Sequence, residues 1–245
     1  MRILIVSDAW EPQVNGVVRT YQYIRNELIK AGHVVDIIGP DRFRSFPMPG
    51  YREIDLAYWP LHKLEGMIAG FEPDTIHIAA EGPLGWKTRT LCHRRGWKYS
   101  TCYHTHFPDY VRARVAKVFK PLANFAKRLS IASLRRFHKK SSALLVATQS
   151  LENTLKEWNF APPMKRLLRG VLTDTFHPGE KTLFQDMPKP VSLYVGRVAI
   201  EKNLPAFLEM NIPGTKIVVG DGPSMEELKR RFPEVQFVGK KVGED

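Results

Sequence analysis

The sequence predicts an α/β protein whose parallel strands are covered by helices on both faces, the doubly wound arrangement. Short β-branched apolar runs recur along the chain, and apolar residues at helical spacing lie between them. The runs are apolar throughout and do not alternate with polar residues, which is typical of parallel strands buried on both faces. Strands and helices are therefore expected to alternate along a parallel sheet.

Eight apolar runs are predicted to be strands: Ile3–Ser7, Val34–Gly39, Thr75–Ala79, Tyr99–Tyr103, Ala143–Ala147, Val191–Gly196, Lys216–Gly220 and Val235–Gly239. A helix is predicted between the first two, ending before Gly32, because six apolar residues there follow helical spacing: Val17, Val18, Tyr21, Ile24, Leu28 and Ile29. The loop before this helix, from Trp10 to Gly16, is longer than most such connections. We regard it as a candidate functional loop.

A segment with three prolines, residues 178–190, is the best candidate for an interdomain linker. We therefore expect an N-terminal domain over residues 1–177 and a second domain over residues 191–245. The second has fewer than about 60 residues, below the usual size of a domain, and is predicted to be incomplete.

The chain has a formal net charge of +12, which indicates an anionic partner such as nucleic acid, a membrane surface or a phosphorylated substrate. No acidic residue occurs between Asp109 and Glu152, while ten basic residues do. Apolar residues interleave with these cations: Phe119, Leu122, Phe125, Leu129 and Ile131–Leu134. This pattern predicts either docking on an anionic membrane or one packed face with solvated cations on the other. No recognised nucleic-acid motif accompanies the charge, so we expect no nucleic-acid partner.

The chain has two cysteines, Cys92 and Cys102, too few for a disulfide framework and without metal-ligand spacing. A reducing cytoplasm is the expected setting. No run approaches the 18 or so apolar residues of a membrane-spanning helix. We predict a cytoplasmic protein, with peripheral attachment to the inner face of the cytoplasmic membrane as the alternative to a freely soluble one.

Polar residues that follow predicted strands are the candidate site residues, because ligands bind at the carboxyl ends of strands in open α/β sheets. Arg197 and Lys202 follow the strand that ends at Gly196. The planar guanidinium group of arginine and the mobile ammonium group of lysine together suit a diphosphate. Two solvated surface cations are the alternative. Asn15 and Gly16 open the first helix, where free N–H groups suit an anion, although an ordinary turn with an asparagine cap gives the same pattern.

His104 and His106 come directly after the strand Tyr99–Tyr103. A histidine there can hydrogen-bond a substrate or carry a proton. The alternative is that one histidine of the pair is packed in the core and the other is solvated. The two lack a third ligand at metal spacing, so zinc is not expected. Glu81 is a further candidate for an acceptor or sugar pocket. The alternative is that it only stabilises the start of a helix by interacting with the helix dipole.

Two common phosphate-binding motifs are missing from the sequence. There is no G-x-G-x-x-G after the first strand and no G-x-x-x-x-G-K-[ST] anywhere. Their absence argues against a dinucleotide enzyme and against a P-loop ATPase.

Five short motifs, in order and spacing, resemble those of the retaining GT-B glycosyltransferases of family four: Pro12–Gly16, Glu81–Pro83, Tyr103–Thr105, Gly196–Asn203 and Val219–Pro223. The chain is most similar to GDP-mannose-dependent alpha-mannosyltransferases and glycolipid-forming relatives. The resemblance implies a GT-B fold of two Rossmann-like doubly wound parallel-sheet domains. The first would bind the acceptor and the second, incomplete here, would bind most of the sugar nucleotide.

The resemblance also implies roles for the candidate residues. Asn15 and Gly16 would bind the donor, the Gly16 amide lying at the diphosphate. Arg197 and Lys202 would grip that diphosphate and stabilise its departure, and His104 would line the sugar pocket as a catalytic residue. The implied reaction moves a hexose, mannose or glucose, to a lipid or glycan acceptor. A nucleoside-diphosphate sugar is the co-substrate, and no cofactor or metal is expected, since no D-x-D triplet occurs.

The chain departs from the family pattern at two places. The usual glycine pair of the first loop is Asn15-Gly16 here. The family's E-x7-E signature, which holds the donor's sugar and ribose hydroxyls, would fall after the last residue, so we expect this chain to be inactive alone. The alternatives are a sugar-nucleotide epimerase of similar fold and a non-catalytic fragment or binding module.

Overall fold

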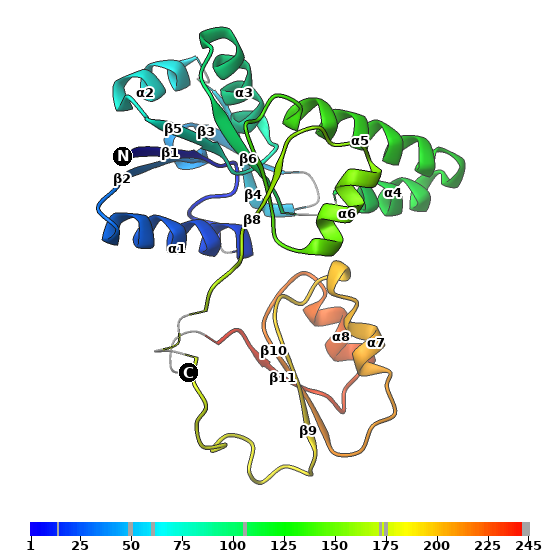
Figure 1. Cartoon of the computed structure of the whole chain (residues 1–245). Helices are drawn as coiled ribbons and strands as arrows, with labels where there is room; N and C mark the ends of the chain where they lie inside the picture. The colour runs from blue at the N-terminus through cyan, green and yellow to red at the C-terminus, as the bar shows by residue number, and fades with distance from the viewer. Residues whose placement is uncertain are drawn as a thin grey trace. The chain divides into compact units, whose positions relative to one another are not determined.

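The computed structural model describes residues 1–13, 15–48, 51–59, 62–104, 107–171, 173 and 176–241. The chain divides into two compact units, Met1–Val171 and Leu172–Asp245 (Figure 1). The segment predicted as a linker, residues 178–190, lies in the second unit.

The first unit contains, in chain order, β1 (Arg2–Val6), α1 (Gly16–Lys30), β2 (Val34–Ile38), η1 (Pro40–Arg42), β3 (Arg44–Met48), β4 (Tyr51–Trp59), α2 (Lys63–Phe71), β5 (Thr75–Ile78), α3 (Pro83–Arg95), β6 (Tyr99–Tyr103), α4 (Phe107–Val118), η2 (Lys120–Leu122), α5 (Ala123–His138), β7 (Leu144–Val146), α6 (Gln149–Glu157) and β8 (Met164–Arg166). Six of the strands form a parallel sheet in the order β2-β1-β5-β6-β7-β8. The five runs predicted as strands in this part of the chain are confirmed, each within one or two residues of its predicted ends.

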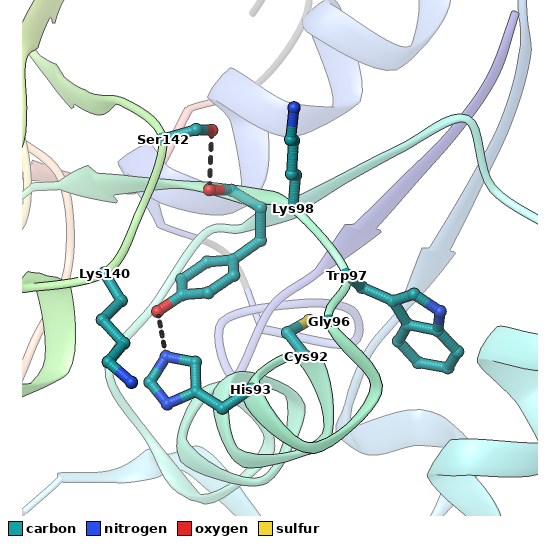
Figure 2. Close-up of a pocket in the computed structure, with 8 residues that line it drawn as sticks. Cys92, His93, Gly96, Trp97, Lys98, Lys140 and Ser142 are labelled. Carbon is teal, nitrogen blue, oxygen red and sulfur yellow. Dashed lines mark hydrogen bonds between the residues drawn. The ribbon is translucent and has the colours of Figure 1, made fainter.

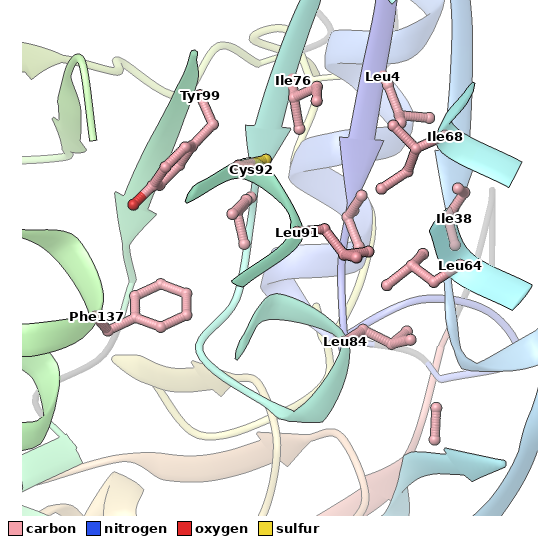
Figure 3. Close-up of a cluster of buried hydrophobic side chains, with 13 residues drawn as sticks. Leu4, Ile38, Leu64, Ile68, Ile76, Leu84, Leu91, Cys92, Tyr99 and Phe137 are labelled. Atoms are coloured by element: carbon pink, nitrogen blue, oxygen red, sulfur yellow. The ribbon is translucent and has the colours of Figure 1, made fainter. Parts of the chain in front are cut away.

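Successive residues of β1 point to opposite faces of the sheet, and both faces are packed. Leu4 and Val6 join a buried cluster with residues of α2 and α3, including Leu64 and Leu84 (Figure 3). Ile5 joins a second cluster with residues of α1. Helices therefore cover both faces, as the predicted doubly wound arrangement requires, with α1 on one side and α2 and α3 on the other (Figure 1).

An antiparallel pair, β3 and β4, lies outside the parallel sheet and was not predicted. In β4, Ala57 is buried while Tyr58 is half exposed. Such alternation is typical of a strand with one solvated face. Arg52, Glu53 and Asp55 interrupt the apolar residues of β4, so this strand does not match the continuous apolar runs that predicted the parallel sheet.

The second unit contains β9 (Val191–Val195), η3 (Ile200–Lys202), α7 (Leu204–Leu208), β10 (Thr215–Val219), α8 (Met225–Arg231) and β11 (Gln236–Gly239). The three strands are parallel, in the order β11-β10-β9, and agree with the three predicted runs within one residue at each end. Leu204, Leu208, Met225 and Leu228 of the two helices pack with Val218 of β10 in one buried cluster.

The loops after β9 and β10 are in backbone contact, which requires glycine. A Cβ atom added at Gly220 would lie 1.8 Å from the carbonyl oxygen of Gly196, and one at Gly222 would lie 2.3 Å from that of Val198. The Gly220-Asp221-Gly222 sequence is thus explained by close packing of the loop that carries Arg197.

Candidate functional site

Polar residues that follow strands of the first unit gather at one edge of its sheet. Asp8, Glu81, His104 and Arg169 follow β1, β5, β6 and β8, and these strands are parallel. The crossover after β1 packs on one face and that after β5 on the other. The carboxyl ends of β1 and β5 therefore form a topological switch point, where open α/β sheets bind ligands.

A chain of hydrogen bonds links His104 through Tyr21 to His77 and fixes the position of its ring. The Tyr21 hydroxyl lies 2.7 Å from Nε2 of His77 and 3.1 Å from Nε2 of His104. His77 Nδ1 lies 2.8 Å from the Ser100 hydroxyl, and His104 Nδ1 lies 3.8 Å from Sγ of Cys102. Every ring nitrogen of the two histidines is thus in contact with a partner that the protein itself supplies.

Both histidines are kept neutral at physiological pH. Burial, and then the proximity of His104, lowers the pKa of His77 to about 3. Burial lowers the pKa of His104 to about 4, with Glu81 opposing the shift and Arg169 adding to it. Because the Tyr21 hydroxyl has one hydrogen, it donates to the lone pair of one neutral ring and accepts the N–H of the other. His104 is therefore suited to hydrogen bonding as a neutral ring and is poorly suited to carrying a positive charge.

Asp8 was not among the predicted site residues, and it caps the start of α3. Its carboxylate accepts the N–H groups of Leu84 at 2.8 Å and Gly85 at 3.0 Å. Burial raises the pKa of Asp8 to about 6, although these backbone bonds oppose the shift. A Cβ atom at Gly82 would lie 2.4 Å from Cγ of Asp8, and one at Gly85 would lie 2.0 Å from the Ala80 carbonyl oxygen. Gly82 therefore allows the Asp8 carboxylate to lie against the start of α3, and Gly85 allows the close approach of the Ala80 carbonyl oxygen.

Glu81 is half-buried and lies next to a buried histidine at the end of α5. Its Oε1 atom is 3.3 Å from Nε2 of His138, whose side chain is fully buried. After burial, the negative charge of Glu81 also acts on the pKa values of Asp8, Tyr103 and His104. This carboxyl group therefore lies near all three side chains. The structure thus brings the two predicted residues Glu81 and His104 together.

The first loop ends at the N-terminus of α1. The Asn15 side chain accepts the N–H groups of Val17 at 2.9 Å and Val18 at 3.1 Å, so it caps the helix. Gly16 begins the helix, and a Cβ atom placed on it would lie 3.9 Å from a guanidinium nitrogen of Arg169. A helix start and a guanidinium group close together favour an anion.

The second unit carries the two predicted cations after β9. Arg197 is half-buried and its carbonyl oxygen accepts the Tyr194 hydroxyl at 2.9 Å. Lys202 is exposed and ends η3, directly before Asn203, whose φ of 49° turns the chain into α7. Both cations therefore stand at the carboxyl edge of the three-stranded sheet, where the sequence predicted them.

The predicted residue His106 lies outside the described residues. Among those described, no group of three or more His, Cys, Asp or Glu side chains is arranged to hold a metal ion. A cavity of about 370 Å³ lies at the amino end of β6, bordered by His93, Lys98 and Lys140 (Figure 2). It is on the opposite edge of the sheet from the site residues.

Five residues of this edge were not predicted as site residues: Asp8, Tyr21, His77, His138 and Arg169. Asp8 follows a predicted strand as His104 does, so the strand-end rule could have found it. Tyr21 was predicted as part of the apolar face of the first helix. Helical spacing does not show which group its hydroxyl contacts. His138 lies at the end of a helix distant in sequence, and no local pattern connects it to Glu81.

Comparison with known proteins identifies the family. The model of Glycosyltransferase Family 4 matches residues 14–175. A GDP-mannose-dependent alpha-mannosyltransferase of Mycobacterium tuberculosis is 24% identical over 271 residues, covering 100% of this chain and 69% of the relative. An alpha-monoglucosyldiacylglycerol synthase of Streptococcus pneumoniae is 24% identical, covering 97% of this chain and 59% of the relative.

The fold is also similar to solved structures. The Anabaena protein HepE, crystallised in complex with UDP, superposes with a TM-score of 0.63 at 11% identity, covering 99% of this chain and 70% of that one. The lipopolysaccharide outer core galactosyltransferase WaaB superposes with a TM-score of 0.58, also at 11% identity, covering 99% of this chain and 69% of that one. The predicted GT-B class is thereby confirmed.

Proposed function

Since the chain belongs to glycosyltransferase family 4, we propose that it transfers a hexose, with retention of configuration, from a nucleoside-diphosphate sugar to a lipid or glycan acceptor. The observation that carries the proposal is the placement of the cations and the histidine. Arg197 and Lys202 follow β9, His104 follows β6, and each strand end is where its sheet binds ligands.

In the proposed reaction the bond between the anomeric carbon and the diphosphate oxygen breaks. The acceptor oxygen bonds to the same face of that carbon, and its proton passes to the leaving phosphate. Negative charge develops on the leaving oxygens, where Arg197, Lys202 and the Gly16 amide would stabilise it. His104 would hydrogen-bond the sugar, since its ring is neutral and held by Tyr21. No metal ion is assigned a role.

GDP-mannose is the proposed donor because the mycobacterial relative is named for it. The test incubates the protein with labelled GDP-mannose or UDP-glucose, with and without a bacterial lipid extract. Acceptor-dependent release of nucleoside diphosphate with label in the lipid supports transfer. Interconversion of the free sugar nucleotide without an acceptor would instead favour the epimerase alternative.

Replacing His104 by alanine is expected to lower transfer roughly tenfold or more while GDP affinity stays within about twofold, because this residue serves the sugar and not the phosphates. Turnover and calorimetric GDP titration are measured on the same preparations. Since His104 bonds to Tyr21, the Tyr21→Phe variant controls for loss of that hydrogen bond with the imidazole retained. A GDP affinity that falls as far as turnover would contradict the assignment.

The polypeptide of residues 1–245 is expected to transfer sugar on the order of tenfold or more slowly than the mycobacterial relative. The second unit shows a three-stranded sheet in its described part, whereas a dinucleotide-binding sheet has about six strands. A loosely oriented donor reacts slowly. Parallel assays of both purified proteins check this, and equal rates would show that the three strands suffice.

We also propose that α4 and α5 dock on an anionic membrane surface and so meet a lipid acceptor. Phe119, Leu122, Phe125 and Leu129 are between 51% and 64% exposed. Leu134, predicted with them, packs in the core instead and is 7% exposed. Exposed cations flank the apolar residues, among them Lys120 and Arg128. Within the described residues no helix is long and apolar enough to cross a bilayer.

Co-sedimentation with vesicles of equal parts phosphatidylglycerol and phosphatidylcholine tests this docking. Binding is expected at low salt and should fade as salt rises, because screening weakens attraction between the surface cations and anionic lipid. The double variant Phe125→Ser, Leu129→Ser should bind several-fold less, whereas Ile29→Ser, which changes an exposed apolar residue of α1, should bind normally. Absence of binding at low salt would leave these side chains without a membrane role.

A further inference from the structure

The hydrogen bonds around His138 determine which of its ring nitrogens carries a proton. Ser141 Oγ donates to the His138 carbonyl oxygen at 2.9 Å, and Thr101 Oγ1 donates to Ser141 Oγ at 3.1 Å. Each hydroxyl has one hydrogen, so both are now used. The third contact, 2.9 Å between Thr101 Oγ1 and His138 Nδ1, therefore takes its hydrogen from the ring. His138 is protonated at Nδ1.

The other ring nitrogen then faces a carboxyl group. With Nδ1 protonated, Nε2 of a neutral ring is an acceptor, and 3.3 Å away lies Oε1 of Glu81, which is also an acceptor when ionised. The His138 ring is fully buried, with the rings of Phe137 and Phe160 at centroid distances of 4.9 and 5.7 Å. Two lone pairs facing each other in such apolar surroundings are unfavourable, and a proton between them removes the conflict.

We propose that His138 is a positioning residue that holds the Glu81 carboxyl group at the edge of the first sheet through a shared proton. One carboxyl oxygen is engaged with His138, and the other remains to accept a hydroxyl of the transferred sugar or of the acceptor. The Glu81 side chain is 26% exposed, so a substrate can reach it. The sugar contact rests on the proposed function. The shared proton rests on the hydrogen bonds that assign Nδ1 and on the 3.3 Å approach of Glu81 to Nε2, a buried nitrogen that has no hydrogen-bond partner among the described residues.

Nitrogen-15 spectra of the histidine rings in the 245-residue chain at pH 7 test the shared proton. The Nε2 resonance of His138 is expected away from the position of an unprotonated ring nitrogen. In Glu81→Ala it should move to that position while Nδ1 stays protonated. Glu157→Ala, which removes an exposed carboxylate at the end of α6, should leave His138 unchanged. A wild-type Nε2 resonance at the unprotonated position would overturn the proposal.

The His138 signal is assigned by its loss in His138→Gln, or, where that variant does not fold, by its contacts with the Phe137 and Phe160 rings. Titration with GDP-mannose and with GDP then tests the sugar contact. GDP-mannose is expected to shift the His138 Nε2 resonance, and GDP is not. Equal shifts would overturn the sugar contact. No shift of any resonance with either ligand would count against donor binding itself, while the spectrum without ligand still decides the shared proton.

Discussion

Replacing Arg197 by alanine is expected to lower sugar-transfer turnover about a hundredfold, the typical effect of removing one preorganised donor to developing negative charge. The backbone that carries Arg197 is held on both sides. Gly196 N–H donates to the Val219 carbonyl oxygen and Val198 N–H to that of Asp221, both at 2.9 Å. A loop fixed in this way needs little rearrangement when the diphosphate departs.

Two further variants separate the charge of Arg197 from its shape. Arg197→Lys should recover part of the activity, since an ammonium group keeps the charge but loses the planar fork. Arg230→Ala removes an exposed cation from α8 and should leave turnover unchanged. Initial rates with GDP-mannose are compared for all three, and an Arg197→Ala enzyme within a few-fold of wild type would exclude the diphosphate role.

Mild acid is expected to destabilise the first unit strongly. The pKa values of His77 and His104 are about 3 and about 4 in the folded chain, against about 6.5 for an unfolded histidine. The unfolded chain therefore binds more protons below pH 6.5, so the stability that these neutral rings provide is present above that pH and is lost as the pH falls. Between pH 8 and pH 5 each histidine costs about 2 kcal/mol of the free energy of unfolding.

Asp8 acts in the opposite direction. Its pKa is raised to about 6 by burial, so the folded chain takes up a proton before the unfolded chain does. It contributes about 1 kcal/mol of stability on acidification to pH 5, which leaves a net loss of about 3 kcal/mol for the three groups.

Tryptophan fluorescence during urea unfolding measures this loss in the first unit, because all five tryptophans lie between residues 10 and 158. His77→Gln should reduce the difference between pH 8 and pH 5 by about 2 kcal/mol, whatever its own stability. His177→Gln removes an exposed histidine of the second unit and should keep the full difference. An unchanged difference in His77→Gln would mean that this histidine is not held neutral.

The parallel sheet was predictable because its strands are continuous apolar runs. Tyr99–Tyr103 was predicted to the residue, and the helix from Gly16 to Lys30 was predicted from its spacing and from Gly32 beyond its end. Charged residues occur in both strands of the β3–β4 pair, and β8 has the sequence Met-Lys-Arg, so neither matched that pattern. Strand β8 is defined by its pairing with β7, which no local pattern shows.

The site was predictable to the extent that it lies at strand ends. His104 and Glu81 were placed there by the strands before them. The bonds that give these residues their chemistry come from Tyr21 on α1 and His138 on α5, both more than 55 residues away in sequence. Such pairings depend on how the helices pack, and the periodicity of a helix fixes the packed face but not the atom that a polar group will meet.

The position of β1 between β2 and β5 also affects how the chain folds during synthesis. Ile3 pairs with Val35 on one side but with Thr75 on the other, 72 residues later in the chain. At about 5 to 20 residues per second, the ribosome needs roughly 4 to 14 seconds to make that second partner. Until then one edge of an apolar strand has no native neighbour, which leaves that edge open to pairing with other chains.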